Sequence, residues 1–243
     1  MKMLTLAGRN AREILRDPLN LCFGLGFPLV LLALLSAIQR SVPVPLFTLE
    51  RLTPGIAVFG LSFMTLFAAT IMARDRRSAL LQRLYTAPLT PADFILGYGL
   101  PMLPMAVAQC GICYLAAMAL GLAPTVRILH AMMAAMPAAV LYVALGLMFG
   151  SVLTDKQVGG ICGALMTNLS AWLSGTWFDL ELVGGGFKAV AEVLPFVHAV
   201  EAQRALLAGD TAAALPHLGW VTGWAGIASL AAVGLFLRQM RRL

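Results

Sequence analysis

The stretch "PGIAVFGLSFMTLFAATIMARDRR", residues 54–77, joins twenty residues that carry no charge to a short run with four charged side chains. An uncharged apolar run of this length can cross a lipid bilayer as one helix. The rest of the chain has the same character, since 60% of its 243 residues are hydrophobic and only 12% are charged. The mean hydropathy of +0.87 excludes a soluble globule and indicates an integral membrane protein.

Six apolar runs predict six transmembrane helices. They cover residues 19–38, 54–73, 94–121, 128–153, 158–178 and 216–237. None shows the alternation of apolar and polar residues that is typical of an outer-membrane strand. We therefore expect an all-α integral membrane protein in which residues 1–243 form a single transmembrane domain.

The distribution of cations predicts the orientation of these helices. Twelve of the seventeen Lys and Arg side chains fall on the side that holds both chain ends: Lys2, Arg9, Arg12, Arg16, Arg74, Arg76, Arg77, Arg83, Lys156, Arg238, Arg241 and Arg242. The positive-inside rule then places both termini in the cytoplasm. A net charge of +6 needs no nucleic-acid partner, because these cations border the membrane and its anionic lipid.

Residues 1–18 have the pattern of an interfacial helix. Leu6 and Ile14 alternate there with Arg9 and Arg12, which suits a helix along the inner leaflet. The acids at the end of this stretch, and the lack of a clear small-residue cleavage site after the first apolar run, argue against a cleaved signal peptide.

The predicted spans carry no charged side chain in their interiors. This absence argues against an ion-coupled secondary transporter, which needs a titratable group near the midplane, and against an intramembrane enzyme. We expect no catalytic residue, metal site or nucleotide loop on this chain, because the three histidines are scattered and no phosphate-loop motif occurs. Cys110 and Cys113 form a C-x-x-C within an apolar span, where helix packing is the simpler interpretation.

Several small residues and prolines predict how the helices pack. Gly146 with Gly150, Gly159 with Gly163 and Gly219 with Gly223 are spaced to allow close helix approach. Pro101, Pro104 and Pro137 remove backbone hydrogen bonds inside the third and fourth spans, so we expect bends there.

The polar stretch at residues 74–91 contains a short amphipathic segment. On a helix over residues 76–87, the side chains of Leu80, Leu81, Leu84 and Tyr85 share one face, with Arg76 and Arg83 beside it. Thr90 can cap the helix that follows, with Asp93 at its third position. The segment is either a cationic loop on lipid headgroups or a lever that docks on a cytoplasmic partner.

Two motifs resemble type-2 ABC export permeases. Arg74-Asp75-Arg76, Leu80-Leu81-Gln82-Arg83-Leu84 and Ala87-Pro88-Leu89-Thr90 resemble the segment between the second and third spans of that family. Leu194-Pro195, His198-Ala199, Glu201-Ala202, Arg204-Ala205-Leu206-Leu207 and Gly209 resemble an element before its last span. The sequence departs from the family pattern at Gln82, where Glu is frequent, and at Ala79-Leu80, where Gly-Thr is frequent.

The resemblance implies how such a protein would be energised. It identifies residues 76–87 as a coupling helix, with Arg76, Leu80, Leu81, Arg83, Leu84 and Tyr85 as contacts to a separate ATPase subunit. It further implies a dimer of permeases, of which a homodimer is favoured, and places ATP and magnesium on the partner subunit rather than on this chain.

The resemblance also implies a substrate path near the second and fifth spans. The candidate lining residues are Phe59, Phe63, Phe67, Asn168 and Trp172. Residues 179–210 are expected to form a re-entrant hairpin with its turn at Gly184–Gly186. Its candidate outer-gate residues are Pro195, His198, Glu201 and Arg204, of which Glu201 and Arg204 are spaced to pair.

The sequence thus leads to an expected function. We expect a permease of the bacterial cytoplasmic membrane that exports an amphipathic or hydrophobic substrate, such as a drug-like compound, an antibiotic or a lipid. The aromatic, weakly polar candidate path suits such molecules. The alternatives are a non-transport membrane scaffold or assembly factor and, third, an ion-coupled secondary transporter.

Overall fold

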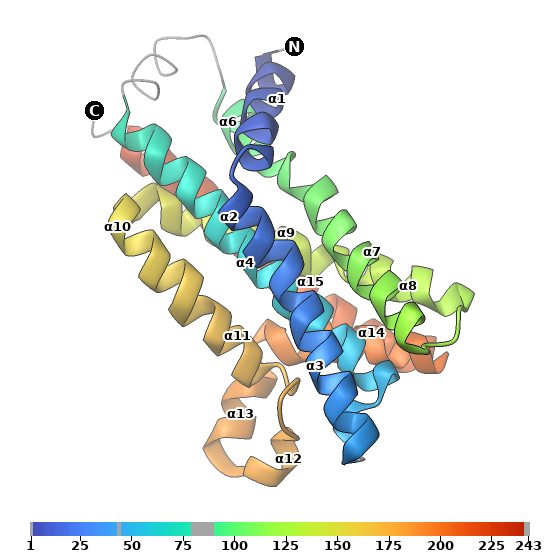
Figure 1. Cartoon of the computed structure of the whole chain (residues 1–243). Helices are drawn as coiled ribbons and strands as arrows, with labels where there is room; N and C mark the ends of the chain where they lie inside the picture. The colour runs from blue at the N-terminus through green and yellow to red at the C-terminus, as the bar shows by residue number, and fades with distance from the viewer. Residues whose placement is uncertain (1, 43–44, 79–89, 241–243) are drawn as a thin grey trace.

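The computed structural model describes residues 2–42, 45–78 and 90–240. Within these ranges every regular element is a helix and no strand occurs, which confirms the predicted all-α fold. Figure 1 shows long helices running alongside one another, with the two ends of the chain at the same end of the molecule.

Five helical stretches of the described residues are long and apolar enough to cross a membrane: Cys22–Ser41, Leu49–Arg77, Ile95–Leu120, Val126–Val152 and Thr211–Gln239. The expected span at 158–178 corresponds to α10 (Asp155–Val158), the π-helix η3 (Gly159–Met166) and α11 (Thr167–Leu173). The five spans make the protein multi-pass. The stretch at 158–178 is not among them, so the count of six crossings stays a prediction.

The N-terminal part of the chain is helical up to the first span. α1 (Lys2–Leu15) is followed by α2 (Pro18–Leu21), the π-helix η1 (Cys22–Gly26) and α3 (Phe27–Ser41). The break between α1 and α2 falls at Asp17, because the ring of Pro18 disfavours a helical backbone at the residue before it. A short 3₁₀ turn, η2 (Pro45–Phe47), precedes the second span.

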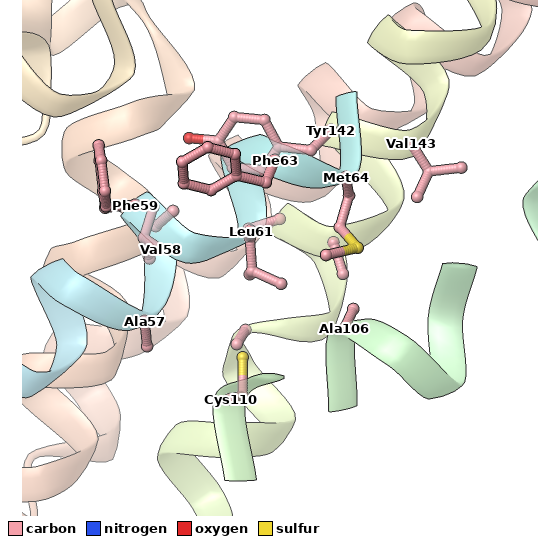
Figure 2. Packing of buried hydrophobic residues seen from close by; sticks show 14 of the residues in the cluster. Ala57, Val58, Phe59, Leu61, Phe63, Met64, Ala106, Cys110, Tyr142 and Val143 are labelled. Carbon is pink, nitrogen blue, oxygen red and sulfur yellow. The ribbon is translucent and has the colours of Figure 1, made fainter. Parts of the chain in front are cut away.

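The second span, α4 (Leu49–Arg77), is the central helix of the bundle. Its side chains are buried almost without interruption from Leu52 to Ala73. It contacts α3, α7 (Met102–Leu120), α9 (Met136–Val152) and α14 (Pro195–Ala208). Figure 2 shows Leu61 and Met64 of α4 close to Ala106 of α7 and Val143 of α9 (Met136–Val152). A helix covered on all sides can pass a displacement at one end to most of the bundle.

α4 and α9 cross closely at two glycines. A Cβ atom on Gly146 would lie 2.6 Å from the carbonyl oxygen of Thr65, and one on Gly150 would lie 2.7 Å from that of Ala69. The Thr65 hydroxyl also donates a hydrogen bond of 2.8 Å to the Tyr142 carbonyl. The predicted role of Gly146 and Gly150 in close packing is therefore confirmed.

The third and fourth spans are each broken where the sequence has proline. α6 (Pro91–Gly99) ends just before Pro101, and α7 begins at the next residue. α8 (Val126–Ala134) and α9 meet at Ala135, two residues before Pro137. A proline cannot donate a backbone hydrogen bond, so the helix bends or breaks in the preceding turn.

Three helices separate α11 from the last span. α12 (Leu180–Val183), α13 (Gly185–Val193) and α14 (Pro195–Ala208) precede α15 (Thr211–Met240). Gly184 and Gly185 have φ angles of +59° and +56°, which only glycine adopts readily, so the predicted turn lies there. Pro195 opens α14 as predicted. Whether residues 179–210 re-enter the membrane stays a prediction.

Candidate functional site

The predicted coupling segment lies mostly outside the described residues. Five of its candidate contacts fall there, and their role stays a prediction: Leu80, Leu81, Arg83, Leu84 and Tyr85. The structure describes the two flanks of the segment. These are Arg76 in the last turn of α4 and Thr90 at the start of α6.

Arg76 fastens the end of α4 to the end of α9. Its guanidinium donates hydrogen bonds to the carbonyl oxygens of Ser151 and Leu153. The last carbonyls of a helix have no partner within the helix and carry partial negative charge. A cation is therefore well placed there, and α9 should follow the movement of the cytoplasmic end of α4.

Thr90 fixes the other flank with a capping box, as predicted. The Asp93 backbone amide donates to the Thr90 hydroxyl over 3.2 Å, and the Asp93 carboxylate accepts from the Thr90 backbone amide over 2.9 Å. Each side chain thereby satisfies a backbone donor that the first turn of α6 leaves free. The start of α6 is thus well defined at the end of the coupling segment.

A buried carboxylate joins three helices beside this flank. The side chain of Asp75 in α4 is 4% exposed. Arg9 of α1 donates to both carboxylate oxygens, over 2.8 Å for the bond from Nη2 to Oδ1. The Tyr98 hydroxyl of α6 donates to Oδ2 over 2.7 Å. The hydrogen bond to Asp75 raises the pKa of Arg9 above its usual value, so the Arg9 guanidinium stays charged.

α1 is also seated directly on α6. The buried Asn10 donates from Nδ2 to the Gly97 carbonyl over 3.1 Å. A Cβ atom on Gly97 would lie 2.7 Å from Cδ2 of Leu6, so a larger residue at this position would displace the Leu6 side chain. The sequence predicted an interfacial helix but not that it packs on α6. The available signal was Asp75, an acid among arginines at the end of an apolar run.

The predicted aromatic stripe is packed inside the chain. Phe59, Phe63 and Phe67 are 7%, 6% and 1% exposed. The ring of Phe59 lies 5.7 Å from that of Trp177 and 6.0 Å from that of Phe27, edge-on or tilted. The role of these three residues as path residues stays a prediction. Within one chain, their packing joins α4 to α3 and to the residues that follow α11.

The other two candidate path residues lie on the outer surface of α11. Trp172 is 52% exposed, and Asn168 is exposed one turn before it. The Asn168 amide donates to the carbonyl of Ala164 in its own helix over 2.8 Å, rather than to a neighbouring helix. The structure therefore does not bring these two residues together with the phenylalanine stripe on one accessible surface.

The candidate outer gate is tied together by Arg204. Its Nη1 atom pairs with Glu201 Oε1 over 2.7 Å, as the spacing predicted. Its other nitrogens donate to the carbonyl oxygens of Arg51 and Gly175, over 3.0 and 3.1 Å. The Arg204 side chain is only 10% exposed, so this is not the exposed pair that spacing alone suggests. Arg204 connects α14 to the start of α4 and to the residues that follow α11.

His198 forms a second connection, which the sequence did not predict. Its Nδ1 atom lies 2.7 Å from Nδ1 of His217 in α15, and its Nε2 atom bonds to the Glu192 carbonyl over 2.8 Å. The indoles of Trp220 and Trp224 both donate to the Val193 carbonyl. The last carbonyls of α13 are thus held by α14 and α15.

A pocket of about 430 Å³ lies among these outer-gate groups. Its lining includes His198, Glu201, Arg204 and His217, together with Lys188 and Glu181. Lys188 pairs with Glu181 over 2.6 Å, and this hydrogen bond raises the pKa of Lys188 above its usual value. Three of the four predicted gate residues line the pocket, while Pro195 lies buried at the start of α14.

Cys110 and Cys113 are both buried in α7 as free thiols. The Gln109 amide donates to the Cys113 sulfur over 3.3 Å. Gln109 itself packs on α4, where a Cβ atom on Gly60 would overlap its side chain. In the described part of the chain, no group of three His, Cys, Asp or Glu side chains is arranged to hold a metal ion.

Comparison with known proteins identifies the family. The family model described as ABC-2 type transporter matches residues 1–208, which is most of the chain. No curated protein matches the sequence. The chain belongs to the ABC-2 type transporter family, and its apolar helices make it a multi-pass membrane permease.

Proposed function

We propose that the chain is the membrane-spanning subunit of an ATP-driven exporter, energised by a separate ATPase subunit. The observation that carries the proposal is its membership of the ABC-2 type transporter family, whose membrane proteins typically pair with an ATPase subunit. ATP and magnesium would then be bound by that subunit.

The charge distribution supports an external energy source. In the five described spans, Asp, Glu, Lys and Arg side chains occur only near the ends. A secondary transporter usually places a titratable or anionic group near the midplane. A permease energised by an ATPase at its cytoplasmic end does not need a titratable group near the midplane.

The contacts around α4 suggest how that energy would be used. ATP binding would draw the coupling segments of two permease chains together and displace the end of α4. Arg76 and the glycine crossing would pass the displacement to α9, while Asp75 would pass it to α1 and α6. We propose a homodimer in the bacterial cytoplasmic membrane. We also propose an amphipathic or hydrophobic substrate, because Trp172 offers an exposed aromatic surface.

Co-purification in mild detergent tests the proposal. The tagged wild-type chain should retain an ATPase subunit, and Leu84→Asp should lose it because a carboxylate enters the apolar face of the predicted coupling helix. Leu182→Asp is the matched control, since Leu182 is 86% exposed in α12, far along the chain from the coupling segment. Absence of an ATPase from every preparation would favour the membrane scaffold instead.

A further inference from the structure

A basic pocket lies where α1 meets α2 and the last turns of α4. It encloses about 550 Å³, and its lining consists of Arg9, Arg12, Glu13, Arg16, Asp17, Pro18 and Arg74. Four guanidinium groups therefore face two carboxylates across one cavity. α1, which contributes three of the lining residues, lies at the end of the molecule that carries the N-terminus (Figure 1).

The pairing within the pocket leaves two of the arginines free. Arg9 is occupied by Asp75 and by Glu13, the latter over 2.7 Å. Arg74 lies 3.8 Å from Asp17, which is a long and largely solvated pair. Arg12 and Arg16 are exposed, and within the described residues neither forms an ion pair. The backbone amide of Arg16 bonds to the Arg12 carbonyl over 3.1 Å, so the two side chains lie one turn apart on the same side.

The positions of the first and second spans lead us to expect the pocket at the depth of lipid headgroups. Pro18 precedes the first residue of the first span, Cys22, by four helical residues, which is roughly 6 Å. α4 has 29 residues and is about 43 Å long, so it exceeds a hydrocarbon core of about 30 Å. Because Arg74, Arg76 and Arg77 gather in its last turn, we expect that end to project out of the hydrocarbon towards the phosphate groups.

Apolar side chains next to the pocket fit a lipid better than a soluble partner. Leu15, between Arg12 and Arg16 in the sequence, is 69% exposed, and Phe23 in η1 is 54% exposed. These side chains would contact acyl chains while the guanidinium groups contact the headgroup. Arginine matches a phosphate by paired hydrogen bonds, and basic pockets beside membrane helices bind anionic headgroups.

We propose that this pocket binds the phosphate group of an anionic phospholipid from the leaflet on the side of the chain termini. Arg12 and Arg16 bind the phosphate, Arg74 completes the cationic wall, and the Arg9–Asp75 pair fixes α1 so that the arginines face the pocket. The proposal does not depend on the ATPase or on the transported substrate.

Native mass spectrometry of the purified full chain tests the site. Wild-type protein in detergent should retain phosphatidylglycerol and lose phosphatidylcholine at matched concentrations. Each arginine near an anionic surface contributes about a fivefold gain in affinity, so Arg12→Gln/Arg16→Gln should weaken phosphatidylglycerol binding by about 25-fold. Arg12→Lys/Arg16→Lys keeps both charges but loses the paired hydrogen bonds, so it should weaken binding less than Arg12→Gln/Arg16→Gln does. Lys156→Gln/Arg238→Gln, which removes two exposed cations outside the pocket, should change it less than twofold.

Three results would overturn the proposal. The first is equal phosphatidylglycerol binding by wild type and Arg12→Gln/Arg16→Gln, with both proteins equally stable to heat. The second is displacement of the lipid by an equal concentration of inorganic phosphate, which would assign the pocket to a free anion. The third is unchanged lipid binding with loss of a co-purifying ATPase, which would assign the arginines to an acidic protein surface.

Discussion

Arg9 in α1 and Asp75 in α4 form a paired hydrogen bond across 66 residues of sequence, next to the segment that separates the second and third spans. The carboxylate is buried and also accepts from Tyr98, so three helices meet at one charged group. A change in the position of the end of α4 must therefore move α1 and α6 or break these bonds.

Asp75→Asn should lower the stability of the protein by about 1–3 kcal/mol. Removing one partner of a buried pair costs roughly 3–5 kcal/mol, and we expect less because Arg9 is 39% exposed and retains Glu13. Unfolding in detergent, followed by circular dichroism, measures the change. Glu181→Gln breaks an exposed pair and should lower the stability much less than Asp75→Asn does. Equal losses in the two variants would mean that Asp75 is not a structural joint.

Arg76→Lys should reduce transport more than ATP hydrolysis. A lysine carries a single charged nitrogen and cannot hold the Ser151 and Leu153 carbonyls with the geometry of a guanidinium. α9 would then follow the end of α4 less closely, while the ATPase still turns over. The ratio of substrate exported to ATP hydrolysed in proteoliposomes measures this loss.

The neighbouring arginine provides the control for that experiment. Arg77 is exposed on the last turn of α4, and Arg77→Lys makes the same chemical change. We expect it to leave the ratio unchanged. A ratio that falls equally in both variants would point to the charge of the loop rather than to the joint between α4 and α9.

Local patterns in the sequence predicted the features that depend on neighbouring residues. Five of the six apolar runs, the cap at Thr90, the turn at Gly184 and the Glu201–Arg204 pair all involve short sequence separations, and the structure has each of them. The family resemblance was also confirmed. These features follow from helix geometry, so a single sequence suffices to predict them.

Contacts between distant segments could not be predicted in the same way. The spacing of Phe59, Phe63, Asn168 and Trp172 did not reveal that the first two are buried and the last two exposed. A helical face in a membrane protein can meet lipid, a neighbouring helix or a second chain, and all three favour apolar residues. The Arg9–Asp75 and His198–His217 contacts were missed because no periodic pattern links their partners.

Gly150→Ala should destabilise the protein through the crossing of α4 and α9. The new methyl group would lie 2.7 Å from the Ala69 carbonyl oxygen and 2.8 Å from its Cα atom. Because these are backbone atoms, the helices must separate, and overpacking of this kind costs about 1–3 kcal/mol. Gly223→Ala is the control, since a Cβ atom there meets nothing within 4 Å. The melting temperature should fall only for Gly150→Ala, and no difference between the two would contradict the tight crossing.

Trp172→Ala and Phe63→Ala distinguish a side chain that contacts the substrate from one that stabilises the fold. Phe63 is 6% exposed, so truncation to alanine should cost about 3–5 kcal/mol of stability. Trp172 is 52% exposed, so its truncation should change the melting temperature little while altering which compounds are exported. Leu230→Ala, at a side chain 75% exposed on α15, is the control for loss of an exposed apolar group. Efflux assays with a panel of amphipathic compounds, read against ATP hydrolysis, measure the effect. If the export profile of Trp172→Ala equals that of Leu230→Ala, the exposed face of α11 does not contact the substrate, and the path must lie elsewhere.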